Sequence, residues 1–232
     1  MQTDRPRSFE FILDILFPEH CPGCDIVVDK GRCMCSECEK QLEYLEDLPW
    51  QSFFEDEING RKVSFDIATA LFYYTGTAAA AVKSFKFRRC LPFADYAAER
   101  MAIKLENDIT ERIDIVTSVP MNIVNRNHRG YDQAELFAVK LADRIGKDYD
   151  PTLLGHRFRY ISQHKRSAKS RNRSADTTYY IKDASKRLDG KNILICDDIF
   201  TTGSTLNACS RLLKQMGAER VFAAAICLRA KK

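Results

Sequence analysis

One stretch of the chain, residues 193–205, limits what it can fold into more than any other. It reads Ile-Leu-Ile-Cys-Asp-Asp-Ile-Phe-Thr-Thr-Gly-Ser-Thr. The four apolar residues are typical of a short buried strand, and two acids follow them at once. After the hydroxyl-rich turn, apolar residues recur at helical spacing, at Leu206, Leu212, Leu213 and Met216. The pattern predicts a strand that ends in a pair of acids and a turn that opens a helix.

The predicted turn has the chemistry of a site for a sugar phosphate. Backbone N–H groups at a helix start are unpaired and lie at the positive end of the helix dipole, so they bind phosphate. Gly203 lets the backbone approach the anion closely. Further donors are the hydroxyls of Thr201, Thr202, Ser204 and Thr205. Asp197 and Asp198 are placed to accept hydrogen bonds from a vicinal diol, and a phosphate beside a diol describes a phosphorylated ribose.

A plainer interpretation of this stretch is a buried strand followed by a capped helix, with solvated acids between them. That interpretation accounts for the apolar residues but not for two adjacent acids followed by a run of small and hydroxyl residues. The two general nucleotide motifs, G-x-x-x-x-G-K-[ST] and G-x-G-x-x-G, do not occur in the chain. The sequence therefore favours a sugar-phosphate site of another type.

The second strong pattern is a pair of C-x-x-C knuckles, Cys21–Cys24 and Cys35–Cys38. Four thiolates at this spacing can converge on one zinc ion, as in a zinc ribbon. The segment is too short and polar to fold by burial, so the metal would supply its stability. Cys33 is a rival for the third ligand position, His20 is a weaker rival ligand, and a redox role is a further alternative. We expect Cys21, Cys24, Cys35 and Cys38 to be the ligands.

The nine cysteines also indicate a compartment. Five of them lie within 21–38, and two others, Cys196 and Cys227, sit in apolar strand-like runs. This uneven, odd-numbered set fits a metal site in a reducing cytosol better than a disulfide framework. No run approaches eighteen apolar residues, and Met1–Ser8 lacks the apolar core of a secretory signal. We expect a cytoplasmic protein without a membrane span, with peripheral contact at the inner face of the membrane as an alternative.

We expect two parts in the chain. Residues 1–60 would hold a short helix at 9–17, the zinc module and an acidic connector, and residues 61–232 would form one α/β domain. The elements expected in this domain are strands at 65–74, 113–119, 177–181, 193–196 and 221–228, and helices at 77–87, 93–106 and 133–145.

Two basic segments of the larger domain are candidates for contact with pyrophosphate. A loop after the strand at 113–119 carries Arg126 and Arg129, and ligands of α/β sheets sit at the carboxyl ends of strands. Residues 157–187 have a net charge of +8, and the polar stretch within them carries Lys165 and Arg171. Such a stretch can be a solvated surface segment, a surface for nucleic-acid phosphates, or a lid whose cations close over pyrophosphate.

The stretch at 193–205 resembles the phosphoribosyl-pyrophosphate (PRPP) motif of type I phosphoribosyltransferases at every position. Over nearly its whole length the chain also resembles the ComF family, of the ComFC type. The features that carry this second resemblance are the twin knuckles, Tyr74 with Lys86-Phe87, Arg129-Gly130-Tyr131-Asp132-Gln133, Gln163 with Arg171-Asn172, and the stretch at 193–205. The family usually has Arg-Gly-Phe-Asn-Gln where this chain has Arg-Gly-Tyr-Asp-Gln.

The resemblance implies a type I phosphoribosyltransferase fold, a mostly parallel twisted sheet flanked by helices, with an N-terminal zinc module. It implies a bacterial cytosolic protein of DNA uptake in natural transformation, associated with imported single-stranded DNA, a helicase and a DNA-processing protein. Asp197 and Asp198 would hold the ribose hydroxyls, Thr201–Thr205 would cradle the 5′-phosphate, and Mg2+ would accompany PRPP.

Two hypotheses on function follow, and the sequence does not name the catalytic residues of either. In the first, the chain is a PRPP-binding protein of DNA uptake that handles single-stranded DNA. In the second, it is an active phosphoribosyltransferase of nucleotide or base metabolism, because the motif is complete although no acceptor site is recognisable. A protein that only binds DNA would not need Asp197 and Asp198, and a simple enzyme would not need a cysteine module.

Overall fold

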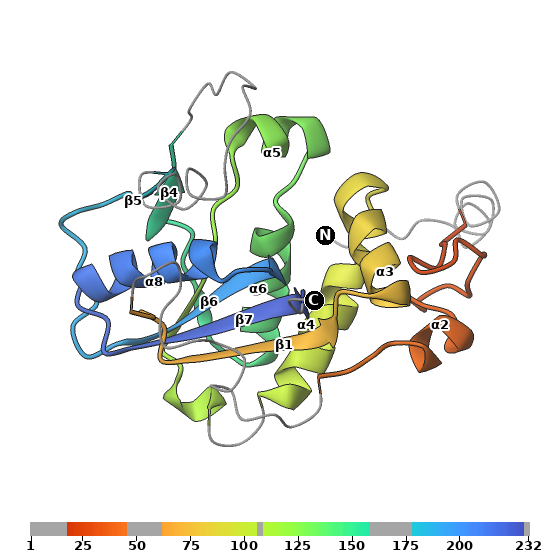
Figure 1. Cartoon of the computed structure of the whole chain (residues 1–232), viewed down its shortest axis with the longest axis horizontal. Coiled ribbons are helices and arrows are strands. Elements are labelled where there is room, and N and C mark those ends of the chain that lie inside the picture. The colour runs from red at the N-terminus through yellow and green to blue at the C-terminus, as the bar shows by residue number, and fades with distance from the viewer. Residues whose placement is uncertain (1–17, 46–61, 106–108, 158–177, 230–232) are drawn as a thin grey trace, which may run out of the picture.

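The computed structural model describes residues 18–45, 62–105, 109–157 and 178–229. Its centre is a five-stranded, all-parallel sheet of order β1-β7-β6-β2-β3 (Figure 1). The strands of the sheet are β1 (Ile67–Tyr73), β2 (Ile115–Ser118), β3 (Asp148–Tyr149), β6 (Asn192–Phe200) and β7 (Arg220–Leu228). A separate antiparallel pair consists of β4 (Leu154–His156) and β5 (Tyr179–Ile181).

Helices cover both faces of the sheet, as parallel sheets require. The helices are α2 (Ser36–Lys40), α3 (Gly76–Phe87), α4 (Pro92–Lys104), α5 (Ile123–Arg129), α6 (Gln133–Arg144) and α8 (Ser204–Gln215), with a 3-10 turn, η1 (Thr110–Arg112). Alternate residues of β6 point to opposite faces. Leu194 and Cys196 join the core under α3, α4 and α6, whereas Ile193 and Ile195 join the core under α8. The fold is therefore a three-layer α/β sandwich.

The central position of β7 follows from its composition. Its sequence, Arg-Val-Phe-Ala-Ala-Ala-Ile-Cys-Leu, is buried at every position after the first. Small residues in its middle let helices on both faces come close to the sheet. Since β7 pairs with β1 on one side and β6 on the other, it joins the first strand of the sheet to the strand that carries the acids.

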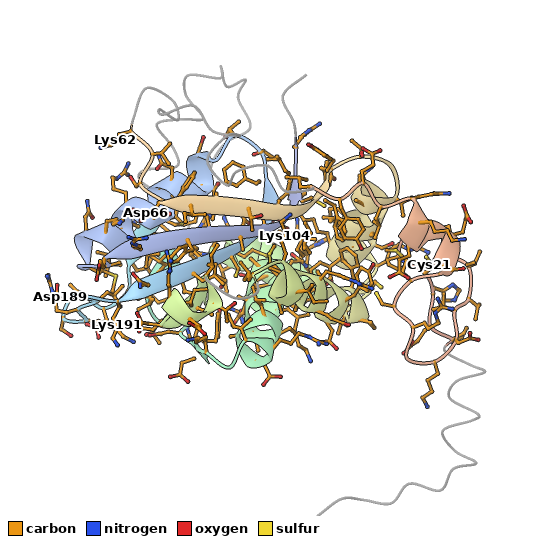
Figure 2. The ribbon with its side chains drawn as sticks, turned by 90° about the horizontal axis from the view of Figure 1, so that it is seen from below. Cys21, Lys62, Asp66, Lys104, Asp189 and Lys191 are labelled. Atoms are coloured by element: carbon orange, nitrogen blue, oxygen red, sulfur yellow. The ribbon has the colours of Figure 1, made fainter. Side chains whose placement is uncertain are left out.

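The N-terminal module, residues 18–45, lies beside α3, across the molecule from β4 and β5 (Figure 1). Figure 2 shows Cys21 of this module at one end of the molecule and Asp189 at the other. The end of the module pairs with the sheet edge, where Tyr44 bridges to Phe72 and the Leu45 N–H donates to the Leu71 carbonyl at 2.8 Å. Module and sheet therefore share backbone hydrogen bonds.

Most elements expected from the sequence are present, with shifts of a few residues at their ends. Three differences matter. The strand expected at 193–196 continues through both acids to Phe200, because its neighbour β7 pairs with it up to Leu228. The segment expected as a basic loop contains helix α5. Strand β4, which pairs with β5, was not expected.

Some expectations lie outside the described residues, namely the helix at 9–17, most of the acidic connector, and the polar stretch with Lys165 and Arg171. In the part of the chain that the structure describes, no helix is both long and apolar enough to pass through a bilayer.

Candidate functional site

The order of the strands places the site. From β6 the chain crosses through α8 to β7 on one side, and from β2 it crosses through α5 and α6 to β3 on the other side. Strand order therefore reverses between β6 and β2, and ligands of open α/β sheets bind at the carboxyl ends of the strands at such a point. Both acids and the hydroxyl-rich turn lie at the carboxyl end of β6.

The two acids share the end of β6 but face different sides of it. Asp198 forms an ion pair with Lys86 of α3, with 2.6 Å between Nζ and Oδ2. Only 17% of the Lys86 side chain and 15% of the Asp198 side chain are exposed. Asp197 accepts a hydrogen bond from the Asp198 N–H at 2.8 Å. Its charge adds to burial in raising the pKa of Cys209 on α8, so Asp197 lies on the α8 side.

Asp197 is the most perturbed acid of the site. Burial raises its pKa well above the ordinary value, the charge of Asp198 raises it further, and Lys86 opposes the rise. Two adjacent carboxylates in a site with little water can share a proton. The pair can therefore accept hydrogen bonds from hydroxyl groups and exchange a proton, and the charge of Lys86 opposes the rise in the pKa of Asp197.

The turn after β6 has the geometry of an anion site. Gly203 adopts a left-handed conformation with φ 73° and precedes the first residue of α8. Thr201 and Thr202 are exposed, and the hydroxyls of Thr202 and Ser204 lie 2.7 Å apart. The first turn of α8 holds no acidic side chain, so its positive dipole end is not neutralised from within the helix. Tyr179 of β5 forms a hydrogen bond with Thr205, and burial raises the pKa of that tyrosine.

Across from this turn, Asp132 organises the carboxyl end of β2. It precedes α6 and is almost fully buried, and it accepts hydrogen bonds from the N–H groups of Met121, Ala134 and Glu135. Burial raises its pKa despite these bonds. Because one side chain ties both the segment after β2 and the start of α6, the wall of the site opposite β6 is fixed in place.

The structure gives Arg126 and Arg129 partners within the protein. Both lie on α5; Arg126 pairs with Glu135 at 2.9 Å, and Arg129 donates to Gln133 at 2.8 Å. The Arg129 guanidinium also lies over the ring of Phe87, 5.2 Å from its centroid. The loop interpretation of this segment is therefore wrong, and the predicted contact of these arginines with pyrophosphate stays a prediction. The same holds for Lys165 and Arg171, which lie outside the described residues.

The four predicted zinc ligands converge. The Sγ atoms of Cys21, Cys24, Cys35 and Cys38 all lie within 4.8 Å of one another, and those of Cys24 and Cys35 are 3.7 Å apart. Tetrahedral zinc with Zn–S bonds of about 2.3 Å separates its sulfurs by about 3.8 Å, so the cluster fits this ion. Cys33 lies outside the cluster and contacts Cys90 instead. The geometry therefore favours Cys35 over Cys33 as the third ligand.

The chemistry of the cluster also suits a cation. Burial works to raise the pKa of Cys21, but hydrogen bonds from the N–H groups of Cys35, Cys24 and Gly23 lower it to about 7. Burial raises the pKa of Cys38, a cost that a bound metal ion would remove. His20 is outside the cluster, where its Nδ1 lies 2.7 Å from the Asp25 carbonyl.

Comparison with known proteins agrees with both parts of the chain. Residues 88–232 match the model of the phosphoribosyl transferase domain, and residues 12–48 match the double zinc ribbon domain. The chain belongs to the phosphoribosyl transferase domain family and carries a double zinc ribbon at its N-terminal side. The fold class expected from the sequence is thereby confirmed.

Relatives extend over most of the chain. Competence protein F of Haemophilus influenzae is 23% identical over 87% of this chain and 92% of its own. DNA utilization protein YhgH of Salmonella typhi is 26% identical over 89% of this chain and 83% of its own. The resemblance to the ComF family is therefore confirmed. Among solved structures, a purine phosphoribosyltransferase of Pyrococcus horikoshii covers 58% of this chain and 72% of its own at 19% identity, with a TM-score of 0.38.

Reasoning from the sequence missed the role of Lys86 in the site, as it missed those of Asp132 and Tyr179. Lys86 was noted as a basic residue at the end of the helix expected at 77–87 and as part of the family resemblance, but its ion pair with Asp198 was not foreseen. The two residues are 112 positions apart, and lysine in the last turn of a helix is common.

Proposed function

We propose that this protein binds PRPP or a closely related phosphorylated ribose and acts in DNA uptake, where it handles single-stranded DNA. The observation that carries the proposal is the joint placement of Asp197, Asp198 and the Thr201–Thr205 turn at the switch point of the sheet. The role in DNA uptake draws support from relatives named for competence and DNA utilization.

In this proposal each group has one task. Asp197 and Asp198 accept hydrogen bonds from the ribose hydroxyls, and the first N–H groups of α8 with the neighbouring hydroxyls hold the 5′-phosphate. Lys86 pairs with Asp198 and places a positive charge beside the two acids. Mg2+ would supply charge neutralisation of the pyrophosphate oxygens, keeping several of its waters. The four cysteines would hold structural zinc.

A titration of PRPP with Mg2+ into the full chain by calorimetry tests the sugar-phosphate site. We expect the Asp197→Asn, Asp198→Asn double variant to weaken binding at least 100-fold, because both acceptors of the diol lose their charge. Asp189→Asn is the matched control, since this exposed acid pairs with Arg187 at the amino end of β6, away from the site. Absence of binding to the wild-type chain would overturn the proposal.

The second candidate is an active phosphoribosyltransferase with an acceptor still to be identified. It is favoured by the domain match over 88–232 and by the completeness of the acid pair and turn. Release of pyrophosphate from PRPP, measured with each nucleobase and with single-stranded DNA in turn, tests it. Acceptor-dependent release would support transfer, whereas PRPP binding without release for any acceptor would leave binding as the function. The cytoplasmic location and the protein partners of uptake stay predictions.

A further inference from the structure

Lys86 links the acid pair to a helix that the cysteine module holds. The Lys86 side chain reaches Asp198 from the last turn of α3, and both partners are largely shielded from water. A charge so placed changes the ionisation of the pair much more than an exposed lysine would, because solvent screens it less. The position of α3 therefore decides how well the acids are neutralised.

The inner face of α3 is set by ordinary packing. Ala81, Val82 and Phe85 are fully buried against the sheet, and the Phe85 ring lies edge-on to Phe93 of α4, with 5.9 Å between the centroids. This packing fixes the helix axis. It leaves the two ends of the helix and its outer side to be held by other parts of the chain.

The module supplies contacts at both ends of α3. At the first turn, Thr77 donates to the Gln41 side chain at 3.0 Å. At the C-cap of the helix, Arg88 forms an ion pair with Asp25, and two residues further on Cys90 contacts Cys33.

Gly23 of the first knuckle lies close to the start of α3. A Cβ atom at this position would lie 2.8 Å from the Thr77 methyl group and 2.8 Å from the Cys38 sulfur. The backbone of the zinc knuckle thus fits between a metal ligand and the start of the helix.

We infer that Lys86 is a positioning residue for Asp198, and that the cysteine module sets the position of the helix that carries Lys86. The zinc module would then act at the sugar-phosphate site without touching the ligand. This inference rests on the proposed function, since it assigns a role within the same site. On this inference, the zinc module is joined to the phosphoribosyl transferase domain because it holds α3, and with it Lys86, in position.

Variants on α3 test the first half of the inference through PRPP titrations. Lys86 opposes the rise in the pKa of Asp197, so its loss should favour the protonated acid, and we expect Lys86→Met to raise Kd at least tenfold at pH 7. Lys86→Arg keeps the charge and should stay within about threefold. Lys83→Met is the control, because Lys83 is exposed on the same helix. An unchanged Kd for Lys86→Met would overturn the inference.

The pH profile separates positioning from a structural role. In Lys86→Met the affinity should recover as the pH rises, with its midpoint shifted upward from that of the wild-type chain. The titratable groups around the acid pair are Cys196 on β6, Asp132 before α6, Tyr179 on β5, Cys209 on α8 and Cys227 on β7. Because these groups are the same in both proteins, the shift reports Lys86. If the pH profile of Lys86→Met ran parallel to that of the wild-type chain and the variant was less stable, Lys86 would have a structural role only.

The second half is tested by loosening the module without touching its ligands. Asp25→Asn removes the charge from the contact with Arg88, and Gln41→Ala removes the hydrogen bond from Thr77; the double variant should leave the zinc content unchanged. We expect PRPP affinity to fall threefold or more, and an affinity equal to that of the wild type would overturn the link.

A readout without ligand keeps this inference distinct from the proposed function. In urea unfolding, a double-mutant cycle of Lys86→Met and Asp198→Asn should show that the two changes are not additive. Failure of the wild-type chain to bind PRPP would overturn the proposed function. Additivity in the cycle would overturn the role of Lys86 whether or not PRPP binds.

Discussion

The module and the sheet domain are held together by different forces. In the module, residues 18–45, few apolar side chains are buried besides the cysteines, and Ile26 and Val27 are more than half exposed. In the sheet domain, β7 alone contributes eight consecutive buried residues. The module therefore depends on its metal, while the sheet depends on packing. The difference teaches that removal of the metal can unfold the module while the sheet domain stays folded.

The largest effect is expected from a ligand of the module. Cys24→Ser should reduce the zinc content, measured by elemental analysis, from one equivalent to near zero. Structural zinc in small domains is worth about 10–16 kcal/mol of apparent binding energy, so the module should lose its fold. Cooperative urea unfolding of the sheet domain should persist. Cys33→Ser is the control and should keep its zinc, because Cys33 lies outside the cluster; loss of zinc there would assign the metal to other ligands.

A change in the core of the sheet should give the converse result. Phe222 is fully buried in β7, and its replacement by Ala should lower the free energy of unfolding by about 3–5 kcal/mol through lost burial and a cavity. Zinc content of the folded protein should not change. Arg220→Ala is the control on the same strand, since Arg220 is exposed. If urea denaturation showed a similar loss in the free energy of unfolding for Phe222→Ala and Arg220→Ala, the sheet domain would not depend on packing.

The smallest effect is expected from Asp197, a site residue whose ionisation lowers the stability of the sheet domain. Burial and Asp198 raise the pKa of Asp197, so its ionised form destabilises the fold. This cost is absent below the unfolded pKa of about 3.9 and grows as the pH rises toward the higher pKa of the folded state. Asp197→Asn should therefore stabilise the protein by about 1 kcal/mol at pH 7 and have no effect near pH 3. Urea midpoints at the two pH values measure the difference, and equal effects at both would contradict it.

The sequence predicted what short-range patterns encode. The spacing of the knuckles predicted the metal cluster, and the apolar runs at 193–196 and 221–228 predicted the two central strands. The extension of β6 through its acids was not predictable, because pairing with β7 rather than local propensity holds Asp197 and Asp198 in the strand.

Helix α5 and the role of Lys86 were missed for related reasons. The start of α5 depends on one hydrogen bond, from the Val124 N–H to the Asn122 side chain, and its end depends on Gly130 at φ 84°. Its polar sequence carries no apolar period that would have predicted a helix. The pairing of Lys86 with Asp198 arises only when α3 is placed against β6 by the rest of the fold.

The pairing of β1 with β7 has a consequence for synthesis on the ribosome. Ile67 aligns with Phe222, so the edge strand and its partner are separated by 155 residues of chain. At roughly 5–20 residues per second, β1 waits on the order of 10–30 s before the strand it needs has been made. During that interval the apolar face of the nascent β1 has no partner strand. β1 must therefore join the sheet late, whereas β2 and β3, which lie only 33 residues apart in the chain, can pair much earlier.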